Sequence, residues 1–151
     1  MIQLDYELSA IWTSRAKYID FKALTYHDFV MSFFNGDQIM VVNAYDCSLR
    51  GLDIPLLDFS KWLFLETKAL VDGAVADVYY TNDEDEKIHL LRTGDKVAVT
   101  SSHAEGAGTI CDYSELLNSS KIYAQRLIET VTNLYPEVSM NTVFRELYLS
   151  T

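Results

Sequence analysis

The spacing of the apolar residues alternates between two periods along this chain, and that alternation most constrains its fold. Residues 2–8 alternate apolar and polar side chains, which is typical of a half-buried strand. Residues 56–70 show helical spacing, short strand-like runs follow, and the C-terminal third is helical again. Because no strand–helix–strand alternation persists, this order predicts an α+β fold. We expect a single domain over residues 1–151, with an antiparallel meander sheet packed by a central helix and a long C-terminal helix.

Two N-terminal segments give local signals of different strength. The apolar runs 29–34 and 39–42 flank Asn35-Gly36-Asp37-Gln38, and Asn-Gly supplies the two positive φ angles that a tight turn requires. These residues therefore predict a β-hairpin. Residues 13–25 fit either a strand or an irregular linker, and their pattern does not choose between the two.

The central helix is expected to begin at Pro55, since a proline in the first turn sacrifices no helical hydrogen bond. Asp72-Gly73 is its expected stop signal. Apolar residues cover more than half of its circumference, so the helix should pack across a sheet face. We expect Phe59, Trp62 and Leu63 to be buried against that sheet.

The meander is predicted from short apolar runs that polar turns separate. A long helix should follow, with Ser119 or Ser120 as its N-cap and Pro136 at its end. A last short helix is expected over residues 141–149. The predicted strands of the meander are 76–81, 87–92, 96–100 and 109–111.

Charge and composition exclude several classes of protein. Lys and Arg number 12 and Asp and Glu number 22, giving a formal net charge of -10, which disfavours binding to nucleic acid or to anionic lipid. No apolar run approaches the ~20 residues of a membrane span, and the N-terminus lacks the pattern of a secretory signal. Two cysteines cannot build a dense disulfide framework. We therefore expect a cytoplasmic protein with neither a nucleic-acid nor a membrane partner.

The chemistry-bearing residues form no complete motif. His103-Ala104-Glu105 matches half of the zinc deaminase signature, but that chemistry needs two cysteine ligands and only Cys111 follows. Cys47, His27 and His89 lack the paired spacing of a structural zinc site. No glycine-rich phosphate loop and no nucleophile elbow is present. We expect no metal, no cofactor and no catalytic residue, while a triad assembled from distant residues stays open.

An acidic run is the remaining feature of the sequence. Asp83, Glu84, Asp85 and Glu86 are consecutive and follow Tyr79-Tyr80. One interpretation is a solvated turn, as charge runs usually are. The other is a patch that binds a basic partner, because acidic clusters steer association and aromatic residues anchor interfaces. On the second interpretation these six residues are the candidate partner-binding site.

The chain resembles small acidic bacterial proteins of the toxin-immunity type. The resemblance rests on the segment 53–63, on the meander 78–100 and on Ser114-Glu115-Leu116-Leu117. It implies a non-enzymatic protein that neutralises a toxin, such as a basic nuclease, by occluding it. Immunity proteins share no catalytic motif, so the resemblance assigns no role to an individual residue.

Two other functions remain as alternatives to an inhibitor. The chain could be a structural or regulatory module that forms a homodimer through an exposed strand edge. It could also be an enzyme whose site is assembled from residues far apart in sequence. A deep pocket with converging polar groups would favour the enzyme, and a flat acidic face with exposed aromatic residues would favour the inhibitor.

Overall fold

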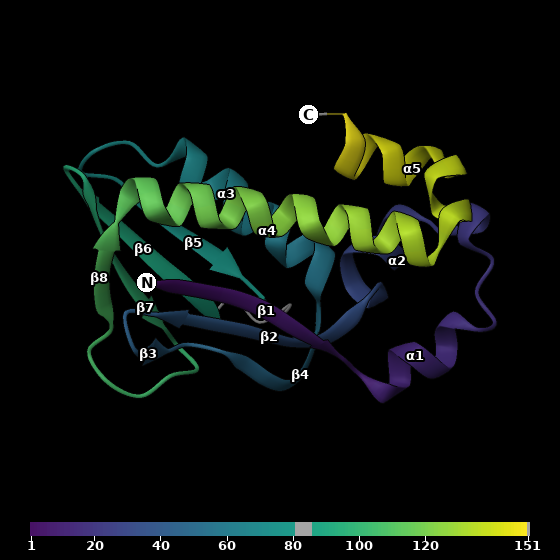
Figure 1. Cartoon of the computed structure of the whole chain (residues 1–151), viewed down its shortest axis with the longest axis horizontal. Helices are drawn as coiled ribbons and strands as arrows, with labels where there is room; N and C mark the ends of the chain where they lie inside the picture. The colour runs from purple at the N-terminus through teal and green to yellow at the C-terminus, as the bar shows by residue number, and fades with distance from the viewer. Residues whose placement is uncertain (81–85, 151) are drawn as a thin grey trace.

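The computed structural model describes residues 1–80 and 86–150 (Figure 1). The fold is α+β, as predicted, with antiparallel sheets and a long helix, α4, in the C-terminal third. None of the described helices has the length and apolar character needed to cross a bilayer. In chain order the elements are β1 (Ile2–Leu8), α1 (Ala10–Ala16), η1 (Phe21–Ala23), α2 (Tyr26–Ser32), β2 (Asn35–Val42), β3 (Tyr45–Asp46), β4 (Leu49–Pro55), α3 (Leu56–Ala69), β5 (Val75–Tyr79), β6 (Lys87–Thr93), β7 (Lys96–Ser101), β8 (Thr109–Asp112), α4 (Tyr113–Leu134), η2 (Pro136–Met140), α5 (Thr142–Phe144) and η3 (Arg145–Leu149).

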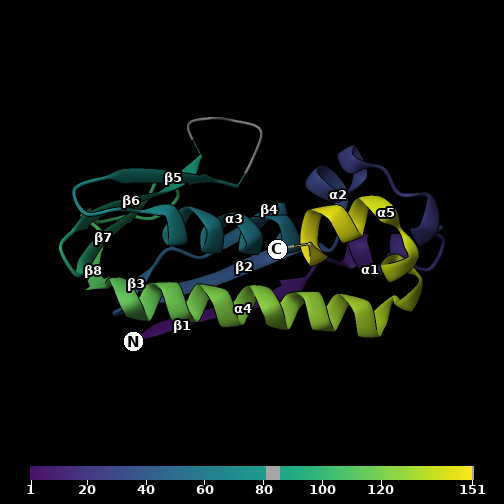
Figure 2. The same cartoon turned by 90° about the horizontal axis from the view of Figure 1, so that it is seen from above.

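The molecule is elongated, and α4 runs along its length. Figure 2 shows the sheet of β5 to β8 at one end and the short helices α1, α2 and α5 at the other. Between them lies the N-terminal sheet, in which β2 pairs with β1 on one side and with β3 and β4 on the other. The alternation predicted for residues 2–8 is confirmed, since exposure alternates residue by residue along β1.

The hairpin predicted around residues 35–38 is wrong. The apolar run before it is helix α2, which Thr25 begins with a capping box: its side chain accepts from the Asp28 N–H, and the Asp28 carboxylate accepts from the Thr25 N–H. Asn35 and Gly36 lie inside β2 instead of in a turn. A Cβ atom on Gly36 would lie 2.1 Å from the Glu7 carbonyl oxygen, so this glycine permits the close approach of β1.

The actual hairpin turn lies eight residues further on, at the end of β2. Asn43 and Ala44 have φ angles of 47° and 69°, and Val42 pairs with Tyr45 across them. Two positive φ angles in a two-residue loop are the type I′ geometry that suits the twist of paired strands. Residues 13–25, left open between strand and linker, contain neither a strand nor one continuous loop: α1 ends among them and the 3₁₀ turn η1 follows.

The second sheet is the predicted meander. Strands β5, β6, β7 and β8 are paired antiparallel in sequence order. Their bounds agree with the prediction to within two residues, because alternating side chains and polar turns are local signals.

Helix α3 begins at Leu56, one residue after the predicted start, with Pro55 as its N-cap, and ends at Ala69, before the expected stop signal. Phe59 and Leu63 are buried, but the prediction for Trp62 is wrong, since that side chain is 42% exposed. Trp62 lies beside the buried stripe of α3, and the Lys61 ammonium is 5.0 Å from the centre of its ring.

Helix α4 begins at Tyr113, earlier than the predicted N-cap at Ser119 or Ser120. Ser120 is buried within the helix, and its hydroxyl donates to the Leu117 carbonyl oxygen. A serine there fits close packing and marks no helix start. The predicted end before Pro136 and the final short helix after Asn141 are confirmed.

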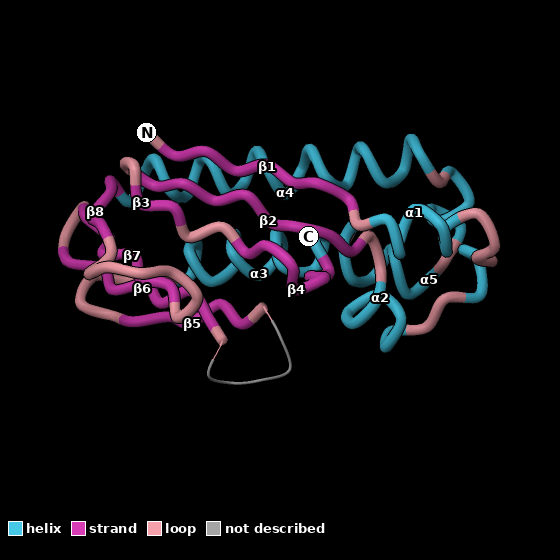
Figure 3. The backbone as a smooth tube through the Cα atoms, turned by 90° about the horizontal axis from the view of Figure 1, so that it is seen from below, coloured by secondary structure: helices cyan, strands magenta, loops and turns pink. Residues whose placement is uncertain are grey.

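Two hydrophobic cores fill the structure, and α3 and α4 contribute to both. The sheet core lies between the two sheets and α3, and the aromatic core lies among the short helices. Figure 3 shows α1, α2 and α5 gathered at the end of the molecule opposite β5 to β8. Prominent members of the sheet core are Met40, Leu49, Ile54, Phe59, Leu63, Ile88, Leu90 and Val99. Prominent members of the aromatic core are Trp12, Phe21, Phe29, Phe33, Phe34, Phe144 and Tyr148.

Candidate functional site

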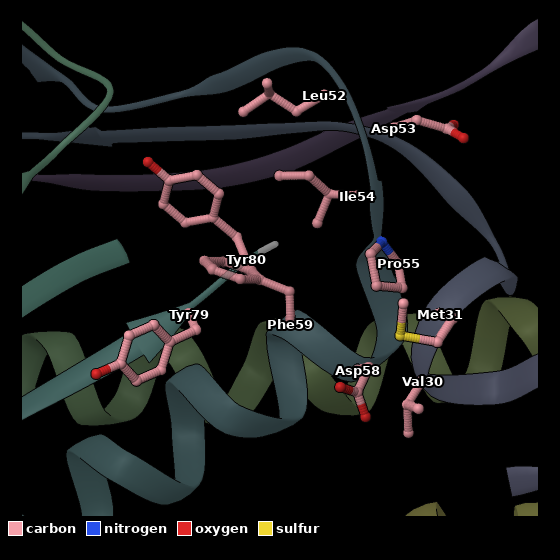
Figure 4. A pocket seen from close by; sticks show the side chains of 10 residues that line it. All are labelled: Val30, Met31, Leu52, Asp53, Ile54, Pro55, Asp58, Phe59, Tyr79 and Tyr80. Atoms are coloured by element: carbon pink, nitrogen blue, oxygen red, sulfur yellow. The ribbon is translucent and has the colours of Figure 1, made fainter. Parts of the chain in front are cut away.

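A hollow of about 390 Å³ opens where the end of β4, the start of α3, the helix α2 and the end of β5 meet. Figure 4 shows Phe59, Ile54 and Pro55 as apolar walls, with Tyr79 and Tyr80 on one side and Met31 on the other. Two carboxylate residues, Asp53 and Asp58, belong to its lining. The chain order explains the junction, because β4 runs into α3 through Pro55 without an intervening loop.

Asp58 is the most perturbed carboxylate of the hollow. Burial raises its pKa to about 6, against the opposing effects of the Lys61 charge and of a hydrogen bond from Tyr148. The Tyr148 hydroxyl donates to Oδ1 of Asp58 at 3.2 Å, which joins the last helical turn to the start of α3. Asp58 forms no ion pair with any other residue that the structure describes.

Lys61, the nearest cation on the same helix, is directed at aromatic rings. Its Nζ atom lies 5.0 Å from the ring centre of Trp62 and 5.5 Å from that of Tyr148. The Lys61 charge lowers the pKa of Asp58, but its ammonium forms no ion pair with that carboxylate. The half-buried carboxylate therefore lacks a bound counter-ion within the described chain.

The wall opposite Asp58 is under backbone strain. Asp53 has a φ of 53°, and Phe34, the residue that precedes the neighbouring strand β2, has a φ of 55°. Such left-handed angles are costly for residues other than glycine. The buried Asn35 amide holds this wall, since its Nδ2 atom donates to the Asp53 carbonyl at 2.8 Å and to the Met31 carbonyl at 3.5 Å. Asn35 of the Asn-Gly pair therefore helps to form the wall of the hollow, and the pair does not form a turn.

The predicted partner-binding residues divide into three groups. Tyr79 is 47% exposed and lines the hollow. Tyr80 is buried; its hydroxyl donates to Glu86 at 3.0 Å and lies 2.9 Å from the Ser102 hydroxyl, so its ring is not presented at the surface. Asp83, Glu84 and Asp85 lie outside the described residues.

Sequence reasoning missed the residues that make the hollow, namely Asp58, Met31 and the strained Asp53. The sequence shows Asp58 only as an acid in the first turn of a helix. Acids are common there because their negative charge interacts favourably with the positive end of the helix dipole. Nothing local distinguishes it from an ordinary surface acid. Its burial depends on Tyr148, which lies 90 residues away in the chain.

A second polar group lies on the outward face of the meander. Asp77, His89 and Thr100 occupy one row across β5, β6 and β7, and His89 Nδ1 is 2.5 Å from Asp77 Oδ1. The residue types match an acid–histidine–hydroxyl triad, but no hydrogen bond joins His89 to Thr100, both of which are described. None of the three residues is among those that line the hollow.

An apolar row crosses the same outward face. Val75, Leu91, Ala98 and Ile110 pair in register across the four strands, and Val75 and Ile110 are largely exposed. Exposed apolar rows on a sheet are found at protein interfaces.

The residues considered for a metal site are dispersed. Cys47 and Cys111 are free thiols inside the sheet core, and burial raises their pKa values to about 12 and about 11. His103 and Glu105 are exposed in the segment between β7 and β8. Within residues 1–80 and 86–150, no three side chains of the metal-binding types come together.

Comparison with protein-family models, curated proteins and solved structures found no match to this chain.

The Asp58→Asn variant is expected to be more stable than the wild type at pH 7.5, by about 1–2 kcal/mol. The pKa of Asp58 is raised from 3.8 to about 6 in the folded state, so folding at neutral pH must bury a charge. Each pKa unit corresponds to about 1.4 kcal/mol, and partial solvent contact reduces the effect. Asparagine keeps the shape and can accept the Tyr148 hydrogen bond.

The stability advantage of Asp58→Asn over the wild type should shrink as the pH falls. As the pH falls from about 6 towards 4, the folded wild type takes up a proton before the unfolded chain does, so its relative stability rises. The difference between the two proteins should therefore vanish near pH 4. Urea denaturation of both proteins at pH 4 and 7.5 measures the difference in their free energies of unfolding. A difference that does not change with pH would show that the pKa of Asp58 is not raised.

Proposed function

We propose that this chain is a non-enzymatic protein that binds a basic partner protein and inhibits it by covering its cationic surface. The toxin-immunity resemblance suggests a toxin, such as a nuclease, as the partner. The observation that carries the proposal is the hollow that is lined both by Asp58, a carboxylate without an ion-pair partner among the described residues, and by the exposed Tyr79. Aromatic anchors beside unpaired charge are typical of tight interfaces.

The charge of the chain supports a basic partner. The formal net charge is -10, and several of the 12 basic residues are already engaged with acids. Each ion pair uses one acid and one base, so the excess of acidic residues stays unpaired. The negative electrostatic field of this excess accelerates association with a cationic protein. The pairs are Lys22–Glu137, Arg50–Asp46, Lys87–Asp77, Lys96–Asp112 and Arg126–Asp5.

A cytoplasmic location fits this proposal. The two cysteines are buried free thiols, as is common where thiols stay reduced. An inhibitor that protects its own cell from a nuclease must act in the compartment that holds the nucleic acid.

The experiment measures how much the acidic run, residues 83–86, contributes to the rate of association with the partner protein. Replacing Asp83, Glu84, Asp85 and Glu86 with the matching amides should slow association with the protein encoded by the adjacent gene about tenfold at low salt. Dissociation should change little, because exposed charges at an interface rim mainly affect the association rate. Surface plasmon resonance at low and at physiological salt measures both rates, and the difference in association should shrink as salt rises.

A charge-matched control separates steering from net charge alone. The control replaces four exposed acids elsewhere, Asp95, Glu105, Glu129 and Glu146, with their amides. It should retain most of the wild-type association rate. Equal slowing by both variants would show that the acidic run is no special site, and failure of the wild type to bind a basic partner would refute the proposed function.

A further inference from the structure

We propose that the hollow beside Asp58 receives one cationic side chain, a lysine or an arginine, from the bound partner. This inference rests on the proposed function and specifies the chemistry that its site recognises. The aliphatic stem of the incoming side chain lies against Met31, Pro55 and Phe59, and its cation pairs with the Asp58 carboxylate.

The first support is the missing counter-ion of Asp58. One carboxylate oxygen accepts the Tyr148 hydroxyl at 3.2 Å, and no described cation forms an ion pair with the group. Neutral donors compensate only part of the cost of burying this charge, since the pKa of Asp58 stays raised despite hydrogen bonds from Tyr148 and Trp62. A cation that enters the hollow would add the direct ion pair that no described residue forms with Asp58.

The second support is the shape and lining of the hollow. Its volume of about 390 Å³ is at the lower end of the range for small-ligand sites, roughly 300–1,000 Å³. Six of the ten residues that line it have aliphatic or phenyl side chains, and Figure 4 places Asp58 on the side of Val30, away from Leu52 and Asp53. Lysine and arginine combine an apolar stem with a charged end, which matches a hollow lined by both apolar side chains and carboxylates.

The charges around Asp58 favour a cation over an anion. Asp53 from β4 adds a second carboxylate to the lining. Lys61 from α3 is the opposing charge, and its ammonium lies over the rings of Trp62 and Tyr148. Tyr148 from the last helical turn is a neutral donor, because burial and the nearby carboxylate raise its pKa. Since the pKa of Asp58 is about 6, cation binding should weaken as the pH falls through that value.

The test uses a free lysine analogue and the methionine methyl groups of the chain. The four methionines are Met1, Met31, Met40 and Met140, and Met31 alone lines the hollow. In protein labelled with ¹³C at the methionine methyls, Nα-acetyl-lysine methylamide should shift the Met31 signal saturably at pH 7.5. The other three signals serve as internal references.

Three controls decide the result. Asp58→Asn should weaken binding of the analogue about tenfold or more, whereas Asp95→Asn, which removes the same charge at an exposed turn, should leave it unchanged. Nα-acetyl-norleucine methylamide, which has an apolar stem without an ammonium, should bind much more weakly. Equal binding by the Asp58→Asn variant, or equal binding of the norleucine analogue, would overturn the inference.

The outcome separates this inference from the proposed function. No partner protein is present in the titration, so an unmoved Met31 signal refutes the cation site and leaves capture of a basic partner to its own experiment. Conversely, a saturable Met31 shift that depends on Asp58 establishes the site even if the adjacent gene encodes no partner. The denaturation experiment on Asp58→Asn shows independently that the variant is folded.

Discussion

Replacing Phe29 with alanine is expected to lower the free energy of unfolding by about 3–5 kcal/mol. Phe29 is fully buried in the aromatic core. The centre of its ring lies 4.9 Å from the ring centre of Phe33, 5.6 Å from that of Phe144 and 6.2 Å from that of Tyr148. The substitution removes these edge-on contacts and leaves a cavity between α2 and the C-terminal helices, which rigid neighbours fill only in part.

Tyr26→Ala on the same helix is the matched control. Tyr26 is 60% exposed, so its removal should cost less than about 1 kcal/mol. Chemical denaturation of the three proteins, followed by circular dichroism, measures both differences. A loss below about 1 kcal/mol for Phe29→Ala would mean that α2 is not packed on the aromatic core, and the Met31 wall of the hollow would then lack its support.

The second large effect is expected at Asn141, where alanine should cost about 3–4 kcal/mol. The Asn141 side chain is buried and satisfies backbone groups of two distant segments. Its oxygen caps the last helix, and its amide nitrogen donates to the segment around η1. The acceptors are the carbonyls of Phe21 at 3.0 Å, Lys22 at 3.3 Å and Leu24 at 2.9 Å, and the donors are the N–H groups of Val143 at 2.9 Å and Phe144 at 3.2 Å.

Serine at the same position separates the two roles of Asn141. A serine hydroxyl can cap the helix but cannot reach the carbonyls around η1, so Asn141→Ser should recover only about 1 kcal/mol of the loss. Denaturation of both variants against the wild type gives the comparison. If serine restored full stability, the bonds to η1 would contribute nothing measurable, and the C-terminal helix would be held by its apolar contacts alone.

Strand parity explains why the predicted pair Tyr79-Tyr80 divides between surface and core. Successive side chains of a strand point to opposite faces, so two adjacent tyrosines cannot both anchor one partner. Tyr80 faces Phe59 in the sheet core, with ring centres 6.4 Å apart, and Tyr79 faces outward with the Lys87 ammonium 5.8 Å from its ring. The exposed member is therefore the one available for binding.

The sequence by itself determined the class of the fold, the strands β5 to β8 and, to within one residue, the start of α3. These features depend on alternation, turn residues and the missing N–H of proline, which act over a few neighbouring residues. The same local rules failed for residues 29–34, since a short apolar run has no distinctive period and the Asn-Gly pair after it serves the approach of β1 and the wall of the hollow. Only the tertiary structure decided the site. Asp58 is an ordinary first-turn acid until Tyr148, the end of β4 and the end of β5 pack around it, because burial and the absence of a counter-ion depend on neighbours that the chain brings from far apart.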